Sequence, residues 1–156
     1  GGASGEEGAL SRDEMRNMYD EADCFVLPTR GEGWGLPVVE AMAMELPVIV
    51  TNHSGPASYM TQDNAYPLNS SVVIGFKEVT RRHVNAVPVG GYAEPDFDHL
   101  LALMRHVTEH QDEARHKGRR ARQDVVATLS SEAVSARMLQ RMLVLRYRAA
   151  AGKTRK

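Results

Sequence analysis

Two short apolar runs, separated by a glycine-rich loop and a helix-forming stretch, limit the fold of this chain most strongly. Residues 24–28 (Cys-Phe-Val-Leu-Pro) and residues 47–51 (Pro-Val-Ile-Val-Thr) are each continuous and have the length of a strand. Strands buried on both faces of a parallel sheet have this pattern. The stretch between them is long enough for one helix, so the sequence predicts a β-α-β unit with a right-handed crossover.

Capping residues place the two helices around the first strand. Ser11, with Glu14 three positions later, has the pattern of a capping box and predicts a helix over residues 11–22. Pro37 suits the first turn of a helix, because the fixed φ of proline matches helical backbone and its missing N–H has no partner there. We therefore expect the helix between the strands at residues 37–45.

Helices also dominate the last third of the chain. Apolar residues spaced three and four apart predict a helix after Pro95, and a strongly charged helix follows over residues 111–127. A third helix begins at Ser130 or Ser131. Its predicted apolar face contains Val134, Met138, Met142 and Leu145. Between the second strand and Pro95, a short helix is expected at residues 57–60, while residues 72–74 and 84–89 fit either strands or irregular extended chain.

These patterns predict one α/β domain, with a parallel sheet and C-terminal helices, over residues 11–150. The length of 156 residues is enough for one domain with its own core. Residues 1–10, rich in Gly, Ser and Glu, are expected to be a disordered tail or linker. Residues 151–156 are expected to form a basic tail.

Charge and cysteine content indicate which partners and which compartment to expect. The formal net charge of -1 gives no reason to expect a nucleic-acid partner. The single cysteine, Cys24, cannot form an internal disulfide, and we expect a cytoplasmic protein. Seven basic residues and no acidic one follow Glu132. This bias favours a solvated helix face and leaves contact with an anionic membrane surface as the less favoured interpretation.

The loop after the first strand has the features of a ligand site. Gly31, Gly33 and Gly35 lie within five residues, and glycine lets a ligand approach the backbone closely. The helix that follows has unpaired N–H groups and a positive dipole end at its start. Ligands of open parallel sheets bind beyond the carboxyl ends of the strands, where this loop lies. The segment therefore predicts a site for a phosphate-bearing ligand.

Two carboxylates accompany this loop. Glu32 lies within it, and Glu40 lies one turn into the helix among apolar neighbours. A carboxylate in apolar surroundings needs hydrogen-bond donors, and sugar hydroxyls can supply them. From the residues alone, Glu40 can equally point into solvent or pair with a nearby arginine.

The run from Pro28 to Ala43 (Pro-Thr-Arg-Gly-Glu-Gly-Trp-Gly-Leu-Pro-Val-Val-Glu-Ala-Met-Ala) resembles a known family. Glu32, seven residues and Glu40 reproduce the Glu-x7-Glu signature of retaining glycosyltransferases with the two-domain GT-B fold. The surrounding residues are similar to the group 1 class, glycosyltransferase family 4. The resemblance extends over about residues 11–145. It implies a partial Rossmann-like sheet, the donor-binding C-terminal domain of a GT-B enzyme.

The resemblance also implies roles for individual residues. Glu32, the expected catalytic-site residue, would accept hydrogen bonds from hydroxyls of the donor sugar, and Glu40 from the ribose of a nucleotide diphosphate sugar. The backbone amides facing the sugar and the diphosphate would be those of Gly33, Trp34, Gly35 and Leu36. No metal and no cofactor would be required. The sequence departs from the family at Glu45, where relatives often have glycine, and at Ser58, where they often have glutamate.

Relatives in this family have an N-terminal acceptor domain that has no counterpart here. We therefore expect the isolated chain to bind donor weakly and to be inactive without such a domain. Two other functions remain open: a non-catalytic binding or assembly module derived from the GT-B fold, and a sugar-nucleotide epimerase of similar fold. The sequence identifies neither the sugar, nor the base, nor the acceptor.

Five further residues could have a functional role. His106 and His110 have a spacing that can hold a metal, but a surface helix face is favoured because no third ligand is placed beside them. His53 follows the second strand and fits a plain turn better than a ligand contact. Trp34 either stacks on a sugar or packs the loop onto the domain. Cys24 is interpreted as a small buried hydrophobic residue.

Overall fold

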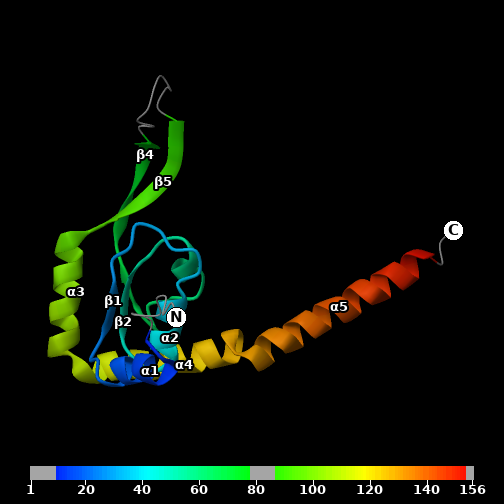
Figure 1. Cartoon of the computed structure of the whole chain (residues 1–156), viewed down its shortest axis with the longest axis horizontal. Coiled ribbons are helices and arrows are strands. Elements are labelled where there is room, and N and C mark those ends of the chain that lie inside the picture. Colours follow the sequence, from blue (N-terminus) through cyan, green and yellow to red (C-terminus); the bar gives the residue numbers. More distant parts are fainter. Residues whose placement is uncertain (1–9, 78–86, 154–156) are drawn as a thin grey trace, which may run out of the picture.

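A computed structural model describes residues 10–77 and 87–153 (Figure 1). Its centre is a parallel sheet of three strands, β1 (Phe25–Leu27), β2 (Val48–Thr51) and β3 (Tyr66–Leu68), in the order β1-β2-β3. Helix α2 (Leu36–Ala43) connects β1 to β2, which pair in parallel. The predicted β-α-β unit and the predicted α/β fold with a parallel sheet are confirmed.

Alternate residues of β2 pack on opposite faces of the sheet. Val48 and Val50 face a cluster with residues of α2 and the second half of α4 (Gln111–Leu129). Ile49 lies on the other face, in a cluster with residues of α3 (Phe97–Glu109) and the start of α4. All four residues of β2 are buried, which is expected for a central strand covered by helices on both faces.

Helix α1 (Arg12–Asp20) begins as the sequence predicts. Ser11 is its N-cap, its hydroxyl accepts a hydrogen bond from the Glu14 N–H, and the Glu14 side chain accepts one from the Ser11 N–H. The predicted tail or linker at residues 1–10 lies outside the described residues, apart from residue 10. The short helix expected at residues 57–60 is a 3-10 turn, η1 (Gly55–Ser58).

The middle segment contains strand structure that the sequence left open. Strands β4 (Ser70–Lys77) and β5 (Val87–Pro95) form an antiparallel hairpin that projects from the carboxyl edge of the sheet (Figure 1). The strand interpretation of residues 72–74 is therefore confirmed. The expected strand at 84–89 begins at Val87, and residues 84–86 lie outside the described part. Strand β3 was not predicted.

The end of α2 explains how Glu45 replaces the glycine of the family. Glu45 has a left-handed backbone, with φ of 64°. The Leu46 N–H donates to the Ala41 carbonyl, and the Glu45 N–H donates to the Met42 carbonyl, which is the pattern of a Schellman motif. The helix therefore ends in a backbone conformation that glycine favours. Because Glu45 has a side chain, this left-handed conformation is strained.

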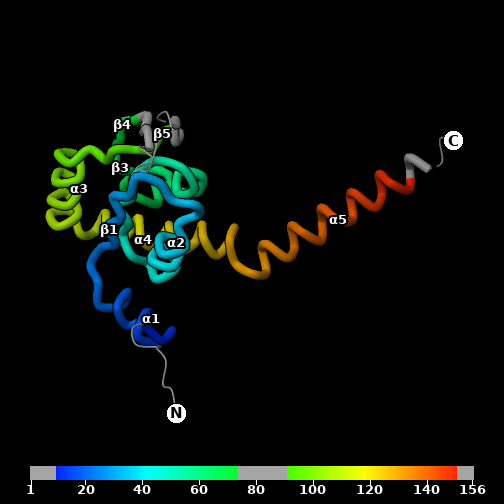
Figure 2. The backbone as a smooth tube through the Cα atoms, turned by 45° about the horizontal axis from the view of Figure 1, so that its top comes forward, coloured from blue at the N-terminus to red at the C-terminus, as the bar shows by residue number. Residues whose placement is uncertain are grey.

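Helix α5 (Ser131–Lys153) leaves the globular part of the protein. It packs against α4 at its start and then projects into solvent (Figures 1 and 2). The helix continues through Lys153, into the range expected as a basic tail, and residues 154–156 lie outside the described part. In the described residues, no helix has both the length and the hydropathy that crossing a bilayer requires.

Candidate functional site

The loop between β1 and α2 lies at the carboxyl edge of the sheet. Because β1 and β2 are parallel, the segment after β2 reaches the same edge, and it packs beneath this loop. An added Cβ at Gly55 would lie 2.1 Å from the Gly33 carbonyl oxygen and 2.7 Å from the Trp34 Cα. Only glycine allows this close approach of two backbone segments.

Tyr59 fixes the end of the loop. Its hydroxyl lies 2.9 Å from the Trp34 carbonyl oxygen and 3.2 Å from the Gly35 carbonyl oxygen, and it donates to this pair of acceptors. Gly35, the N-cap of α2, has φ of 78°, a left-handed conformation that glycine adopts without strain. The carbonyl groups of Trp34 and Gly35 therefore point toward Tyr59.

The backbone N–H groups at the start of α2 are available to a ligand. The N–H groups of Val38 and Val39 both donate to the Gly35 carbonyl, and Pro37 has none. Within the described residues, no hydrogen bond has as its donor the backbone N–H of Gly33, Trp34, Gly35 or Leu36. These groups and the positive end of the α2 dipole form an arrangement suited to an anion.

Glu32 is half-buried and its backbone is tied to the segment after β2. Its N–H donates to the Ser54 hydroxyl at 3.1 Å, and its carbonyl accepts from the Gly55 N–H at 3.4 Å. Burial and then the charge of Glu32 raise the pKa of Tyr59 to about 12. The Glu32 carboxylate therefore lies near the tyrosine that holds the loop.

Glu40 has a different environment. It is exposed, and its Oε2 accepts a hydrogen bond from the Tyr19 hydroxyl at 3.0 Å. Neither alternative from the sequence describes it fully, since its partner is a tyrosine of α1 and not an arginine. Burial, followed by the hydrogen bond to Glu40 and its charge, raises the pKa of Tyr19 to about 12. The sequence places Tyr19 on a helix and gives no signal of this contact.

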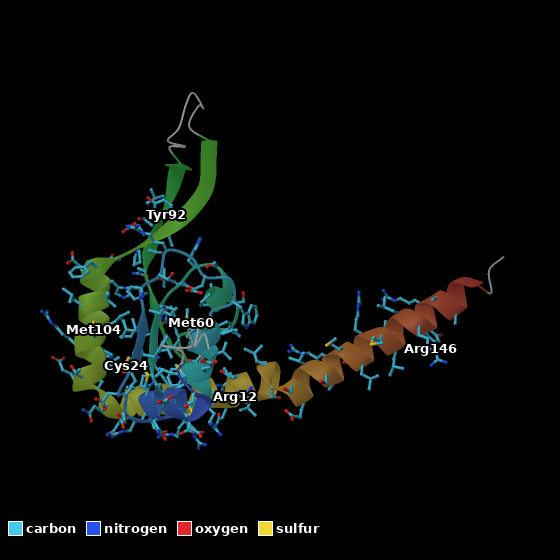
Figure 3. The ribbon with its side chains drawn as sticks, viewed as in Figure 1. Arg12, Cys24, Met60, Tyr92, Met104 and Arg146 are labelled. Atoms are coloured by element: carbon cyan, nitrogen blue, oxygen red, sulfur yellow. The ribbon has the colours of Figure 1, made fainter. Side chains whose placement is uncertain are left out.

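Arg30, the basic residue of the loop, is held by the hairpin. Its guanidinium forms two contacts with the Glu94 carboxylate, at 2.9 and 3.1 Å, and lies 5.5 Å from the centre of the Tyr92 ring. The Ala93 N–H also donates to the Arg30 carbonyl at 2.9 Å. Strand β5 therefore fixes the beginning of the loop, and Figure 3 shows Tyr92 at this edge of the molecule.

Trp34 packs against the Tyr59 ring, with 5.4 Å between centroids, yet 45% of its surface is exposed. It therefore packs the loop onto the domain and still presents a face to solvent, so both interpretations of this residue keep a structural basis. His53 is half-buried in the turn after β2, where its N–H donates to the Thr51 carbonyl.

The other residues singled out in the sequence lie away from the loop. His106 and His110 stack at 4.0 Å between ring centroids, and His106 Nε2 lies 3.0 Å from Glu113. The described residues contain no cluster of three or more side chains suited to a metal ion. Cys24 is half-buried, and burial raises the pKa of its thiol to about 11.

A cavity of about 540 Å³ lies at the opposite end of the sheet. Its lining includes Cys24 and Pro47, where β1 and β2 begin, together with Val107 and Ala114. None of its lining residues belongs to the loop between β1 and α2. Figure 3 shows Cys24 and Tyr92 at these two ends. The cavity is therefore separate from the candidate site.

Comparison with known proteins identifies the segment that contains the site. Residues 7–74 match the family model described as glycosyl transferases group 1. This segment is therefore similar to the group 1 glycosyltransferases. Residues 7–74 include both glutamates, the loop, α2 and β1 to β3.

Curated relatives match over shorter stretches. The chain is 38% identical over 56 residues to the sulfoquinovosyl transferase SQD2 of Arabidopsis thaliana, and these residues are 36% of the chain and 11% of that protein. It is 40% identical over 48 residues to mannosylfructose-phosphate synthase of Agrobacterium fabrum, 31% of the chain and 11% of that protein. It is 50% identical over 42 residues to sucrose synthase of Solanum tuberosum, 27% of the chain and 5% of that protein.

A solved structure matches over most of the chain. Sucrose-phosphate synthase from Thermosynechococcus elongatus superposes with a TM-score of 0.65 at 22% sequence identity. The match covers 92% of this chain and 30% of that protein. The fold of the chain is therefore that of part of a glycosyltransferase with a GT-B fold, as the sequence predicted. The chain spans a minor part of each relative it matches.

Proposed function

We propose that this chain is the donor-binding part of a retaining glycosyltransferase, which transfers a sugar from a nucleotide diphosphate sugar to an acceptor. The observation that carries this proposal is the loop of the group 1 segment: Tyr59 contacts the carbonyls of Trp34 and Gly35, while four consecutive N–H groups of the loop have no partner among the described residues. Such groups suit the diphosphate, because aligned backbone N–H donors bind anions at a helix start.

In the proposed complex, each part of the donor has its own partner. The diphosphate lies against the amides of Gly33, Trp34, Gly35 and Leu36. Glu32 accepts hydrogen bonds from the sugar hydroxyls, and Glu40 accepts them from the ribose. Trp34 presents its exposed face beside the sugar. A donor bound in this way requires no metal from this chain.

The proposed reaction breaks the bond between the anomeric carbon and the diphosphate oxygen. The bonding electrons leave with the diphosphate, and its growing negative charge is stabilised by the loop amides and the α2 dipole. The acceptor hydroxyl attacks the anomeric carbon from the side that the diphosphate leaves, which retains the configuration, and its proton passes to an oxygen of the departing diphosphate. Glu32 stabilises the oxocarbenium-like sugar through its hydroxyls.

The diphosphate carries more charge than the loop can balance alone. Arg30, the basic side chain of the loop, is paired with Glu94. We therefore propose that further cationic groups, outside the loop, complete the site, and that the chain binds donor weakly and shows no turnover without an acceptor domain.

Titration of the 156-residue chain with UDP and GDP, followed by NMR chemical shifts, tests the proposal. Glu40→Ala should weaken binding about tenfold to a hundredfold, since a hydrogen bond to a charged group contributes about 1.5–3 kcal/mol. Glu109→Ala, an exposed glutamate near the end of α3, is the matched control and should leave the dissociation constant unchanged. Equal affinity of the Glu40→Ala variant and the unmodified chain would show that the ribose role is wrong.

A further inference from the structure

We propose that Tyr19 of α1 is a positioning residue for Glu40, holding one carboxylate oxygen so that the other faces the ribose of the donor. This inference rests on the proposed function of Glu40. It assigns a role in donor binding to a helix that lies before β1 and supplies no residue of the Glu-x7-Glu motif.

The position of the Tyr19 hydroxyl is fixed by the packing of its ring. The ring is half-buried against the core cluster that contains Val38 and Met42, and its centroid lies 6.2 Å from that of Phe25. From this position the hydroxyl reaches α2, where it lies 3.0 Å from Glu40 Oε2 and 3.5 Å from the Pro37 carbonyl oxygen. A side chain anchored on the sheet thus contacts an exposed carboxylate on the helix.

The contact distinguishes the two carboxylate oxygens of Glu40. A carboxylate has two oxygens, and the donor from Tyr19 engages Oε2. Oε1 then remains for a ribose hydroxyl. An exposed glutamate without such a partner samples several rotamers, and fixing it on binding lowers affinity. Tyr19 fixes part of that freedom before the donor arrives.

The hydroxyl remains a donor at neutral pH. Burial, with the hydrogen bond to Glu40, raises the pKa of Tyr19 to about 12. The group is therefore protonated throughout the physiological range and donates to the negatively charged Glu40. Hydrogen bonds to charged acceptors are stronger than those between neutral groups.

Tyr19→Phe separates this role from a structural one, because it keeps the ring and its packing and removes only the hydroxyl. The dissociation constants of UDP and GDP are measured by NMR titration for the unmodified chain, Tyr19→Phe, Glu40→Ala and the double variant. Tyr147→Phe, on the exposed part of α5, is the matched control. A parallel titration uses 2′,3′-dideoxyuridine diphosphate, which lacks both ribose hydroxyls.

The expected result is a coupled loss. Tyr19→Phe should weaken binding of UDP or GDP about threefold to tenfold, as expected for one hydrogen bond. It should have no further effect in the Glu40→Ala background and none on the dideoxy nucleotide. Tyr147→Phe should leave all the dissociation constants unchanged.

Five results would overturn the inference, and they separate it from the proposed function. Unchanged affinity in Tyr19→Phe, with a loss in Glu40→Ala, removes the role of Tyr19 and leaves that of Glu40. An equal loss in both backgrounds, or a Tyr19→Phe variant that does not fold, shows that Tyr19 is structural. Unchanged affinity in Glu40→Ala refutes the ribose role first. Binding of neither nucleotide by the unmodified chain refutes both.

Discussion

Gly55 lies directly beneath the loop that presents the candidate site. Its position leaves no space for a side chain, since an added Cβ would lie 2.1 Å from the Gly33 carbonyl oxygen. The contact joins the segments after β1 and β2, which are held by two further hydrogen bonds, from the Glu32 N–H to Ser54 and from the Gly55 N–H to Glu32. The shape of the loop therefore depends on a residue outside it.

Gly55→Ala should displace the loop. We expect a loss of about 1–3 kcal/mol in the free energy of unfolding, as for other overpacked sites, and weaker binding of UDP and GDP. Urea unfolding and NMR titration measure the two effects. Gly31→Ala is the matched control for the free energy of unfolding, because an added Cβ at Gly31 meets nothing within 4 Å. If both variants behave alike, the close contact at Gly55 does not determine the shape of the loop.

Residues of the candidate site differ in how far the sequence could predict them. The loop with Glu32 and Glu40 was predicted because its glycines, its helix start and its carboxylates are adjacent in the chain. Tyr19, Gly55 and Tyr59 were not, because each reaches the site through a contact between segments 20 or more positions apart. A single tyrosine or glycine carries no local signal of such a contact.

At the scale of elements, the sequence predicted two kinds of element. Some are stabilised by residues close to one another in the chain, and others are completely buried. The capping box at Ser11 and the continuous apolar run of β2 are one example of each. Strand β3 has three residues, with Pro67 in the middle, and forms because β2 offers it an edge to pair with. The hairpin of β4 and β5 likewise depends on pairing across the segment between them.

The end of α2 makes a specific prediction about the stability of an element. Glu45 adopts φ of 64°, a conformation that costs roughly 1–2 kcal/mol for a residue with a side chain. Glu45→Gly should relieve this strain. The substitution also removes a contact of 3.6 Å with Arg122, but both side chains are half exposed, and such pairs contribute little. We expect the free energy of unfolding to rise by about 0.5–1 kcal/mol in urea denaturation.

The control for this effect removes only the ion pair. Glu45→Gln keeps a side chain at the left-handed position and loses the charge that faces Arg122. Its stability should differ from that of the unmodified chain by less than about 0.5 kcal/mol. If Glu45→Gly is no more stable than Glu45→Gln, the backbone at this position carries no strain.

At the scale of the whole molecule, the distribution of apolar surface is uneven. The core surrounds the three-stranded sheet, whereas α5 projects from it (Figure 2). Many apolar side chains of α5 are exposed. The most exposed of these are Met138, Leu139, Met142 and Tyr147, at 59–76%. The sequence predicted this helix, but it did not predict that the apolar side chains would be exposed. Periodicity identifies an apolar face and does not reveal what that face packs against.

Exposed apolar surface of this kind favours association between copies. We therefore expect the 156-residue chain to associate with rising concentration, as measured by sedimentation velocity. Deletion of residues 131–156 should reduce this association and leave the sheet folded, because α5 packs against α4 and not against the sheet. Circular dichroism and the urea midpoint would report whether the core is retained.

The effect of charge on association must be separated from the effect of apolar surface. The deleted segment has seven basic residues and one acidic residue, so its loss makes the remaining chain strongly negative and itself opposes association. The variant Met138→Gln/Met142→Gln/Leu145→Gln leaves the charge of the full chain unchanged and removes apolar surface only. If association persists in this variant and disappears in the deletion, charge controls it and the exposed face of α5 does not. If both lose association, the apolar face is responsible, since it is the one feature that both variants lack.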